Sequence, residues 1–550
     1  MQTVEPGVVG QKAVASGRVV ATSQHPVVTD AMLDTVAHGG NAVDAVVTGA
    51  LIQATIQQEM TNHAGTVSCL YWDNLNKELH DLNSVGTPAY DLAPFHRVPG
   101  GHGFYAPPGT RGPFAVLPGF IPGLAALHGR FGSRPWETLV TPAVPWAEEG
   151  NVVTSFEHFV QALTVDFFLY TPSGRQHFLV DGHLPQVGDR WPKPALAQTL
   201  RGLAAEGPEW FTTGPWARAF VQRANDLGWD ITIEHLTRTP PRWGSGQRFT
   251  WRDHEIVQLS APERQAAFSA ITLGVFDALG GTGFGHYSQD PEGAWALGHA
   301  LRIADRMCGY LNDTQVFESP VDALLDPDFH ESLAKIVKGQ KTSADLSNHV
   351  TLTHGPTAVA AAGGAPDQPA GSCELTVVDA QGNWVQLMNT LQSGGIPGEV
   401  VGGVPMVGSH SLPSLAAGMS HWLAEGARIK CILACTMVLR DGEPWWSLGS
   451  PGNVHCTAPQ VLLNGLGYSM SPNEAEDAPR MLPMDDNYVL GIESRVSEDM
   501  AAGLARRGVL LEALAPYDFH MGTYQMAWRD GDEFRSYTGR RRAGKAAGAG

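Results

Sequence analysis

Cysteine is scarce in this chain of 550 residues, which contains only six. No two of them have C-x-x-C spacing, and the chain is far too long for six cysteines to form a disulfide-rich secreted scaffold. The low cysteine content therefore indicates a reducing compartment, and we expect a cytoplasmic protein. The sequence also gives no reason to expect a cofactor.

Long apolar runs and basic blocks are missing as well. The longest apolar stretch, residues 43–56, is interrupted by Asp44 and Gln53, whereas a membrane-spanning helix needs about 20 apolar residues. The first residues lack the basic and apolar regions of a secretory signal. Lys and Arg number 36 against 55 Asp and Glu, a net charge of −19. Because such a surface repels phosphate backbones and anionic lipid, we expect neither nucleic acid nor a membrane as partner.

The remaining composition is that of a large globular protein. Hydrophobic residues make up 43% of the chain and charged residues 17%, which excludes the disordered and fibrous classes. The length suggests three or four domains, although one layered unit of this size is also possible. Glycine and proline are concentrated in residues 343–371, which by composition form a flexible connector.

Helical and strand patterns lie on either side of this connector. An amphipathic helix is predicted over residues 32–40, and a second helix, rich in small apolar residues, begins after Asn41. Residues 375–389 predict a strand, a tight turn at Gln381-Gly382-Asn383 and a second strand. Residues 435–448 follow the same pattern, and a helix is expected over residues 455–463. Two successive hairpins and a helix indicate antiparallel sheet layered against helices.

Several of these segments resemble the gamma-glutamyltransferase family of N-terminal-nucleophile (Ntn) hydrolases. The segments that carry the resemblance, in family order over nearly the whole chain, are residues 39–45, Ala304-Asp305-Arg306, Thr376-Val377-Val378-Asp379 with Gly382-Asn383, and Gly449-Ser450-Pro451-Gly452. The resemblance implies an α+β fold, a four-layer αββα sandwich. It also implies a precursor that cleaves itself into a large region, residues 1–371, and a small region, residues 372–550. The two regions stay together as one structural unit, and a higher oligomer remains open.

The resemblance places the nucleophile at Ser372, directly after Gly371. Counting back without gaps from the matching strand brings Ser372 to the family's N-terminal position. A hydroxyl is a weak nucleophile at neutral pH, and a free α-amine on the same residue, with a pKa near 8, can act as its base. Cleavage between Gly371 and Ser372 would supply that amine. Cys373 is the alternative nucleophile, because thiols are intrinsically stronger, but the register favours Ser372.

Further catalytic positions follow from the same resemblance. The turn at Gly449-Ser450-Pro451-Gly452 matches the family's oxyanion loop, so the backbone N–H groups of Gly452 and Asn453 are expected to stabilise the tetrahedral oxyanion. Thr390 matches a second threonine that orients the nucleophile. Gln392 stands where the family has an asparagine that contacts substrate.

The groups that bind a glutamyl substrate in the family are absent. Asn83 stands where the family has an arginine for the substrate carboxylate, and a neutral amide cannot make that bidentate charged contact. Cys431 and Ile432 replace a pair of serines, and no carboxylate stands in the segment 409–412 that matches the family's amino-binding acid. Gamma-glutamyl transfer is therefore disfavoured.

The residues that stand in place of the family's glutamyl-binding groups indicate a substrate pocket that is more apolar than the family's. Asn83, Gln392, Cys431, Ile432 and His455 are the candidate substrate contacts. Such a pocket suits a small-molecule amide whose acyl group lacks the charges of an amino acid. Cys431 and Cys435, four residues apart, invite a zinc interpretation, but strands do not direct such cysteines to one point, so no metal site is expected.

The sequence therefore predicts a self-processing amidohydrolase or acylase that acts through an acyl-enzyme on Ser372. Two alternatives use the same scaffold: an acyltransferase with an amine acceptor, and a hydrolase of C–C bonds beside carbonyls. A third is a binding protein that kept the fold but lost processing and catalysis.

Overall fold

The computed structural model describes residues 12–87, 117–163, 165, 169, 171–228, 231–238, 240–339, 371–391, 396, 398–406, 426–428, 433–452, 454–484 and 489–550. Four predicted site residues, Gln392, Cys431, Ile432 and Asn453, lie outside these ranges. So does the connector predicted before Gly371. The other site residues are described.

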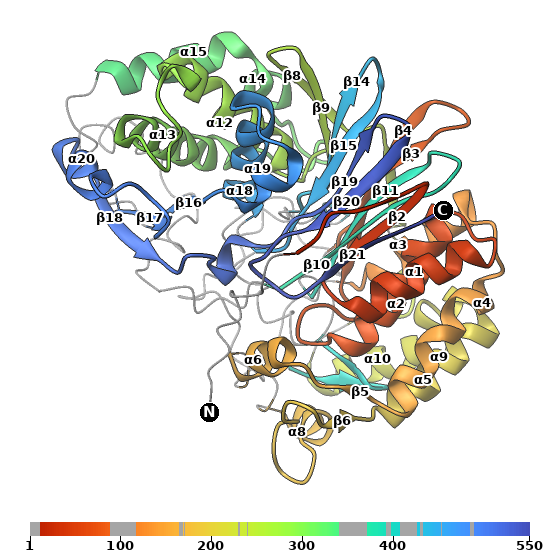
Figure 1. Cartoon of the computed structure of the whole chain (residues 1–550). Coiled ribbons are helices and arrows are strands. Elements are labelled where there is room, and N and C mark those ends of the chain that lie inside the picture. The colour runs from red at the N-terminus through yellow and green to blue at the C-terminus, as the bar shows by residue number, and fades with distance from the viewer. Residues whose placement is uncertain are drawn as a thin grey trace.

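Two seven-stranded sheets form the centre of the molecule (Figure 1). The first has the order β1-β20-β19-β15-β14-β9-β8, and the second has the order β21-β2-β10-β11-β3-β4-β7. The strands of the first sheet are β1 (Ala15–Gly17), β20 (Glu533–Thr538), β19 (Gln525–Asp530), β15 (Glu443–Gly449), β14 (Thr436–Arg440), β9 (His254–Gln258) and β8 (Gln247–Trp251). Those of the second are β21 (Lys545–Ala549), β2 (Val19–Ser23), β10 (Cys373–Val378), β11 (Trp384–Thr390), β3 (Thr66–Asp73), β4 (Glu78–Ser84) and β7 (Arg242–Gly244).

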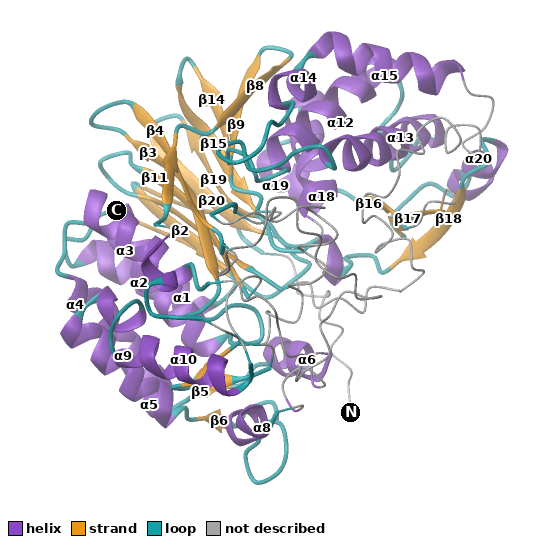
Figure 2. Cartoon of the chain, turned by 180° about the vertical axis from the view of Figure 1, so that it is seen from behind, coloured by secondary structure: helices purple, strands orange, loops and turns teal. Residues whose placement is uncertain are grey.

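Helices cover the outer face of each sheet, so the molecule has four layers (Figure 2). Over the second sheet lie α1 (Pro26–Ala37), α2 (Ala42–Ile56), α3 (Phe120–Phe131), α4 (Trp136–Val140), α5 (Val144–Glu148), α9 (Pro194–Glu206) and α10 (Pro215–Asp226). Over the first lie α12 (Gln265–Leu279), α13 (Pro291–Cys308), α14 (Val321–Leu325), α15 (Pro327–Gly339) and α18 (Val454–Leu462). The predicted α+β, four-layer αββα sandwich is confirmed.

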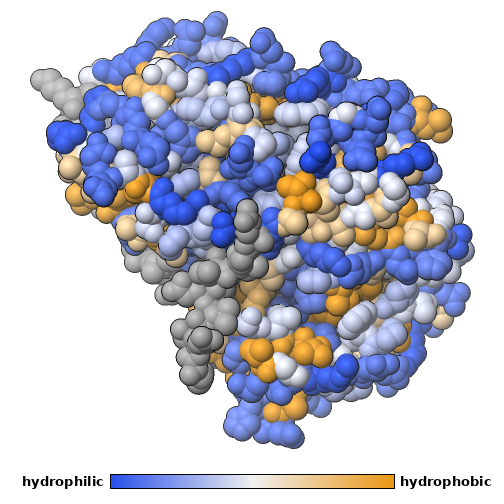
Figure 3. Space-filling view, viewed as in Figure 1, coloured by the Kyte–Doolittle hydropathy of each residue, from blue (hydrophilic) through white to orange (hydrophobic). Residues whose placement is uncertain are grey.

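Smaller elements complete the chain. They are α6 (Ser155–Leu163), α8 (Pro172–Phe178), α11 (His235–Arg238), α19 (Pro472–Asp477), α20 (Met500–Arg506), β5 (Asn151–Val152), β6 (Arg190–Trp191), β12 (Val400–Val401), β13 (Val404–Pro405), β16 (Met481–Pro483), β17 (Val489–Glu493) and β18 (Leu510–Leu514). The face of the molecule seen in Figure 3 is largely hydrophilic, with its apolar side chains in separate patches. Among the described residues, no helix combines the length and the apolar character needed to cross a membrane.

Two of the segments that carry the family resemblance are hydrogen-bonded to each other. They are residues 39–45 and the segment 376–383. Asn41 caps α2 and forms a capping box with Asp44, whose carboxylate also accepts backbone N–H groups of Ser133 and Arg134. Asp379 accepts the N–H of Ala42, 3.0 Å away, and also accepts N–H groups of its own hairpin turn. These motif residues therefore join α2 to the hairpin that begins at the predicted nucleophile.

The predicted hairpins and helix are present. Strands β10 and β11 pair in antiparallel fashion, as do β14 and β15, and α18 lies where a covering helix was expected. Apolar residues of both sheets meet between the layers, including Val378, Trp384 and Met437. Toward the start of β10 this inner space becomes polar, with a fully buried Glu374. The predicted nucleophile lies at that polar end.

Candidate active site

Ser372 lies directly before β10 in an unusual backbone conformation. Its φ is +96°, a region that a residue with a Cβ adopts only at a cost of roughly 1–2 kcal/mol. The Ser372 hydroxyl donates to Oγ1 of Thr390, 2.8 Å away, and its backbone N–H donates to the carbonyl of Met60, 3.0 Å away. The structure thus brings together Ser372 and Thr390, which the sequence analysis paired, and holds the nitrogen beside the same hydroxyl.

Thr390 is held in place by a close backbone approach. A Cβ built on Gly65 would overlap the carbonyl oxygen of Thr390. The Gly65 carbonyl in turn accepts the N–H groups of Gly119 and Phe120 at the start of α3, at 2.8 and 2.9 Å. Only glycine allows this approach. Gly65 therefore stands where the hydrogen-bond partner of Ser372 is positioned.

The Cys373 thiol donates to Oε1 of Gln57, 3.8 Å away, and not to this pair. Its side chain is fully buried in an apolar cluster with Met60, Phe156, Val160 and Phe519. Burial raises the pKa of the Cys373 thiol well above its usual range. A thiol that is held protonated in an apolar environment is a poor nucleophile, and the geometry favours Ser372.

Glu374, the second residue of β10, links the start of this strand to Gly449 of the predicted oxyanion loop. Its Oε1 accepts hydrogen bonds from Nε2 of Gln386 at 2.6 Å and from the Cys435 thiol at 3.5 Å. A Cβ on Gly449, the last residue of β15, would overlap this carboxylate. Burial raises the pKa of Glu374 to about 8, so the side chain is a neutral acid at neutral pH.

The titration of Glu374 leads to a testable pH dependence. In the folded protein this acid keeps its proton up to about pH 8, whereas the unfolded chain releases it near the ordinary value of 4.5. The folded state therefore binds one more proton between these values, and the free energy of unfolding falls as the pH rises, by about 1.4 kcal/mol per pH unit for one such proton. We expect Glu374→Gln to make this fall less steep in chemical denaturation at pH 5, 6 and 7. The exposed Glu498→Gln serves as the control and should leave the slope unchanged; an unchanged slope in Glu374→Gln would contradict the assignment.

The predicted oxyanion loop packs against a second loop, residues 519–522. Gly452 has φ +88°, and a Cβ there would lie 2.8 Å from the His520 carbonyl oxygen. Gly522 has φ +73°, and a Cβ there would overlap the carbonyl oxygen of Pro451 and the hydroxyl of Ser450. The two glycines let the two backbones approach more closely than side chains would permit.

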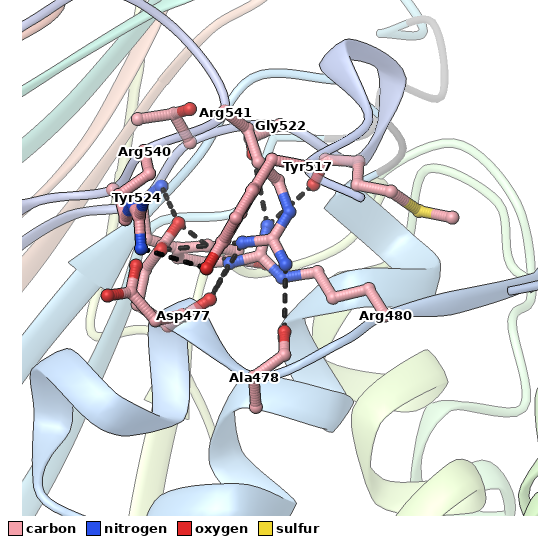
Figure 4. Close-up of polar contacts among 12 residues, drawn as sticks. Asp477, Ala478, Arg480, Tyr517, Gly522, Tyr524, Arg540 and Arg541 are labelled. Carbon is pink, nitrogen blue, oxygen red and sulfur yellow. Dashed lines mark hydrogen bonds and ion pairs between the residues drawn. The ribbon is translucent and has the colours of Figure 1, made fainter. Parts of the chain in front are cut away.

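A buried ionic network supports the second loop (Figure 4). Arg480 donates to the carbonyls of Met521 and Gly522, at 2.7 and 3.1 Å, and pairs with Glu476. Arg541 pairs with Glu476 and with Glu493, at 3.4 and 2.6 Å. All four charged side chains are fully buried. Because removing one member would leave the other buried charges uncompensated, we expect the network to hold the backbone against which the predicted oxyanion loop packs.

The structure describes two of the candidate substrate contacts, Asn83, which is hydrogen-bonded within the protein, and His455, whose Nδ1 is buried without a hydrogen-bond partner among the described residues. The Asn83 amide donates to Glu263, 3.2 Å away, and accepts the N–H of Val85. The ring of His455 packs edge-on against Phe268 of α12, and burial lowers its pKa to about 4, so this imidazole is neutral. In the described part of the chain, no group of three or more His, Cys, Asp or Glu side chains is arranged to hold a metal ion.

Comparison with known proteins identifies the family. The family model for gamma-glutamyltranspeptidase matches residues 29–549. The chain belongs to the gamma-glutamyltranspeptidase family. This family membership confirms the predicted resemblance and the assignment as a hydrolase that acts on carbon–nitrogen bonds.

Relatives of the chain include both acylases and glutathione hydrolases. Acylase ACY 1 proenzyme of Pseudomonas sp. strain V22 is 27% identical over 408 residues, 72% of this chain and 68% of its own length. The glutathione hydrolase proenzyme of Pseudomonas aeruginosa is 26% identical over 512 residues, 84% of each chain. The crystal structure of cephalosporin acylase from Bacillus halodurans superposes with a TM-score of 0.82 over 98% of both chains at 21% identity, which shows the shared fold.

Several residues that shape the site were not found from the sequence. They are Met60, Glu374, Gly522 and the ionic network of Glu476, Arg480, Glu493 and Arg541. Met60 and Gly522 act through partners far away in the chain, and Arg541 pairs with glutamates 48 and 65 residues before it, so no local pattern marks these residues. Glu374 lies two residues after the predicted nucleophile, but its contact with Gly449 could not be predicted from that position.

Proposed function

We propose that this member of the gamma-glutamyltranspeptidase family cleaves itself between Gly371 and Ser372 and then hydrolyses an amide through an acyl-enzyme on Ser372. The observation that carries the proposal is the arrangement of Ser372: its hydroxyl hydrogen-bonded to Thr390 and its backbone in a strained positive-φ conformation at the predicted cleavage site.

Self-cleavage follows from that geometry. The Ser372 oxygen attacks the Gly371 carbonyl carbon, and the hydroxyl proton passes to the Ser372 nitrogen. The Gly371–Ser372 C–N bond breaks, and the peptide becomes an ester on the serine oxygen. Water hydrolyses the ester, which leaves a carboxylate on Gly371 and a free amine on Ser372. The strain stored at Ser372 is released when the peptide bond breaks and therefore favours cleavage.

The freed amine then serves catalysis. The Met60 carbonyl, which accepts the Ser372 N–H in the uncleaved chain, is placed to keep the amine beside the hydroxyl. The amine takes the hydroxyl proton as Oγ attacks the substrate carbonyl, and the proton passes to the departing amine product. We assign the N–H groups of Gly452 and Asn453 to the oxyanion, and water hydrolyses the acyl-enzyme.

We propose that the two pieces remain together as a heterodimer. Strand β10, which would begin the small piece, pairs with β2, and β11 pairs with β3. In the other sheet β14 pairs with β9. Hydrogen-bonded ladders therefore join residues 1–371 to residues 372–550 in both sheets. A reducing, cytoplasmic location is part of the proposal, supported by free thiols at the five described cysteines.

The decisive experiment is a denaturing gel of the purified protein, followed by N-terminal sequencing of the smaller piece. We expect two bands, at about two-thirds and one-third of the full length, with Ser372 as the first residue of the smaller one. A sequence that starts at Cys373 would move the nucleophile by one residue. A single full-length band that survives long incubation would refute self-processing and favour the non-catalytic binding protein.

Hydrolysis is separated from its alternatives by product analysis. An acyltransferase would consume an added amine and form a new amide, whereas an amidohydrolase releases the free acid whether or not the amine is present. Cleavage of a 1,3-diketone in place of an amide would indicate the C–C hydrolase.

A further inference from the structure

Glu374 is a fully buried acid that lies against the strand end from which the predicted oxyanion loop begins. A Cβ built on Gly449 would overlap Oε1 of Glu374 and would lie 2.7 Å from Nε2 of Gln386. Within its own sheet, Gly449 pairs with Gln525 of β19. Gly449 is therefore fixed in the sheet on one side and covered by the Glu374 carboxyl group on its face.

The two oxygens of this carboxyl group differ in their surroundings. Oε1 accepts hydrogen bonds from Gln386 and from the Cys435 thiol. Oε2 is buried and has no hydrogen-bond partner among the residues that the structure describes. An ionised carboxylate needs donors at both oxygens, whereas a protonated acid carries its own hydrogen on one of them. The arrangement therefore fits a neutral acid with its proton on Oε2.

The surroundings of Glu374 contain little that could compensate a negative charge. The titratable groups that face it are the thiols of Cys69, Cys373 and Cys435 and the phenol of Tyr524. Burial raises the pKa of all four above the usual range, so each is neutral at pH 8. In the described ranges of the chain, no Lys, Arg or His side chain forms an ion pair with Glu374. Loss of its proton would therefore leave an isolated buried charge.

That charge would lie close to the reacting groups. Glu374 pairs with Met388 in the β10–β11 register, and Thr390, the partner of Ser372, follows two residues later on the same face of β11. Such diagonal neighbours lie about 7–8 Å apart. The proposed oxyanion donors also follow Gly449 within four residues. Because like charges repel strongly in a site of low dielectric, an ionised Glu374 would oppose formation of the oxyanion.

We propose that Glu374 is a positioning residue that must keep its proton for catalysis: the neutral acid holds Gly449 and the oxyanion loop in place, and ionisation lowers the rate at alkaline pH. The inference rests on the proposed function and adds a regulation of the same site. Because burial raises the pKa of Glu374 to about 8, the loss of activity is expected above that pH.

Two groups then shape the pH profile in opposite directions. The α-amine of processed Ser372 acts as a base only without its extra proton, so activity rises as the pH passes its pKa, near 8 for such an amine. Glu374 supports catalysis only with its proton, so activity falls as the pH passes the pKa of this acid. The wild type is therefore expected to show a bell-shaped profile whose alkaline limb belongs to Glu374.

The test replaces the acid by a neutral group of the same shape. In Glu374→Gln the amide oxygen can accept the two hydrogen bonds of Oε1, and the amide nitrogen takes the place of the protonated Oε2. Processed wild type and variant are assayed from pH 6 to pH 10 with p-nitroanilides of uncharged acyl groups from acetyl to hexanoyl. At pH 9 only about one-tenth of the wild type keeps the Glu374 proton, so the ratio of variant to wild-type kcat should rise about tenfold between pH 7 and pH 9.

A second variant moves the alkaline limb without removing the acid. The Gln386 donor stabilises the ionised form of Glu374 and holds its pKa down. Gln386→Met should therefore shift the alkaline limb to higher pH. Glu157→Gln is the matched control, because Glu157 is also fully buried and burial also raises its pKa, but its carboxyl group accepts from Thr154 before α6. This control should leave the alkaline limb unchanged.

The outcomes separate the inference from the proposed function. An alkaline limb that persists in Glu374→Gln, or that does not move in Gln386→Met, would overturn the inference and leave the proposed function standing. Loss of activity at every pH in folded, processed Glu374→Gln would also overturn it, since a neutral group would then not suffice. If Glu374→Gln does not fold, the shift in Gln386→Met provides the test. Hydrolysis of no amide by processed wild type would instead refute the proposed function.

Discussion

Replacing Ser372 with alanine is expected to leave the protein as one full-length chain without hydrolytic activity. The variant lacks the Ser372 hydroxyl oxygen, which attacks Gly371 during self-cleavage and carries the acyl group during catalysis. No other group can take over these two steps. We expect a loss of 10⁴-fold or more, the order of magnitude seen when a catalytic nucleophile is removed. A denaturing gel after long incubation and an assay with an amide donor measure the two effects together.

Two further substitutions, one at Cys373 and one at Ser372, show whether this result is specific to the Ser372 hydroxyl. Cys373→Ala removes the alternative nucleophile from the apolar cluster and should still be processed, although it leaves a small cavity. Ser372→Thr keeps a hydroxyl at the same position and should retain processing and part of the activity. If Ser372→Ala is cleaved and Cys373→Ala is not, the nucleophile is Cys373, and the proposed mechanism is wrong as written.

Replacing Gly522 with alanine is expected to lower the rate of catalysis by displacing the predicted oxyanion loop. The new Cβ would overlap the Pro451 carbonyl and the Ser450 hydroxyl, so the oxyanion loop must shift away from its present position. Because loss of one oxyanion donor lowers kcat by roughly 10²–10³-fold, we expect a decrease of that order in processed protein. Steady-state kinetics on the processed fraction measures it.

Gly531 provides a matched control for this substitution. Its φ is +63°, close to the +73° of Gly522, and a Cβ built there meets no atom within 4 Å. Alanine at Gly531 therefore meets no neighbouring atom, whereas Gly522→Ala both creates the clash and places a Cβ on a backbone, φ +73° and ψ 176°, that glycine alone adopts readily. Equal kcat values for the two variants would show that the contact with Pro451 does not hold the oxyanion loop.

A position for the active site could be predicted from the sequence because the elements around Ser372 are local. The hairpin of β10 and β11 follows from alternating strand residues around a glycine turn, and Ser372 lies at a fixed distance before it. The four-layer arrangement came from the family resemblance and was confirmed. The pairing of Ser372 with Thr390 also rested on that resemblance, and the antiparallel register accounts for it, since Cys373 lies opposite Asn389.

The surroundings of the nucleophile could not be read in the same way. Gly65 lies against Thr390, Gly522 lies against Pro451, and Arg480 donates to Gly522, all across long stretches of chain. A glycine at a close backbone approach looks the same in the sequence as a glycine in any turn. The ionic network of Arg480 and Arg541 likewise has no signature, because burial decides whether an arginine is a surface charge or a fixed support.

By itself, the sequence determined the class of fold and the family. It also predicts Ser372 as the first residue of the small region. Those properties are written in strand and turn periodicity and in short ordered motifs. Only the tertiary structure decided that Cys373 is buried, that the Glu374 carboxylate lies against Gly449 and that Arg541 is paired with two buried glutamates. The physical reason is that the energy of a charge or a thiol depends on what lies around it, and the sheets assemble those surroundings from distant segments.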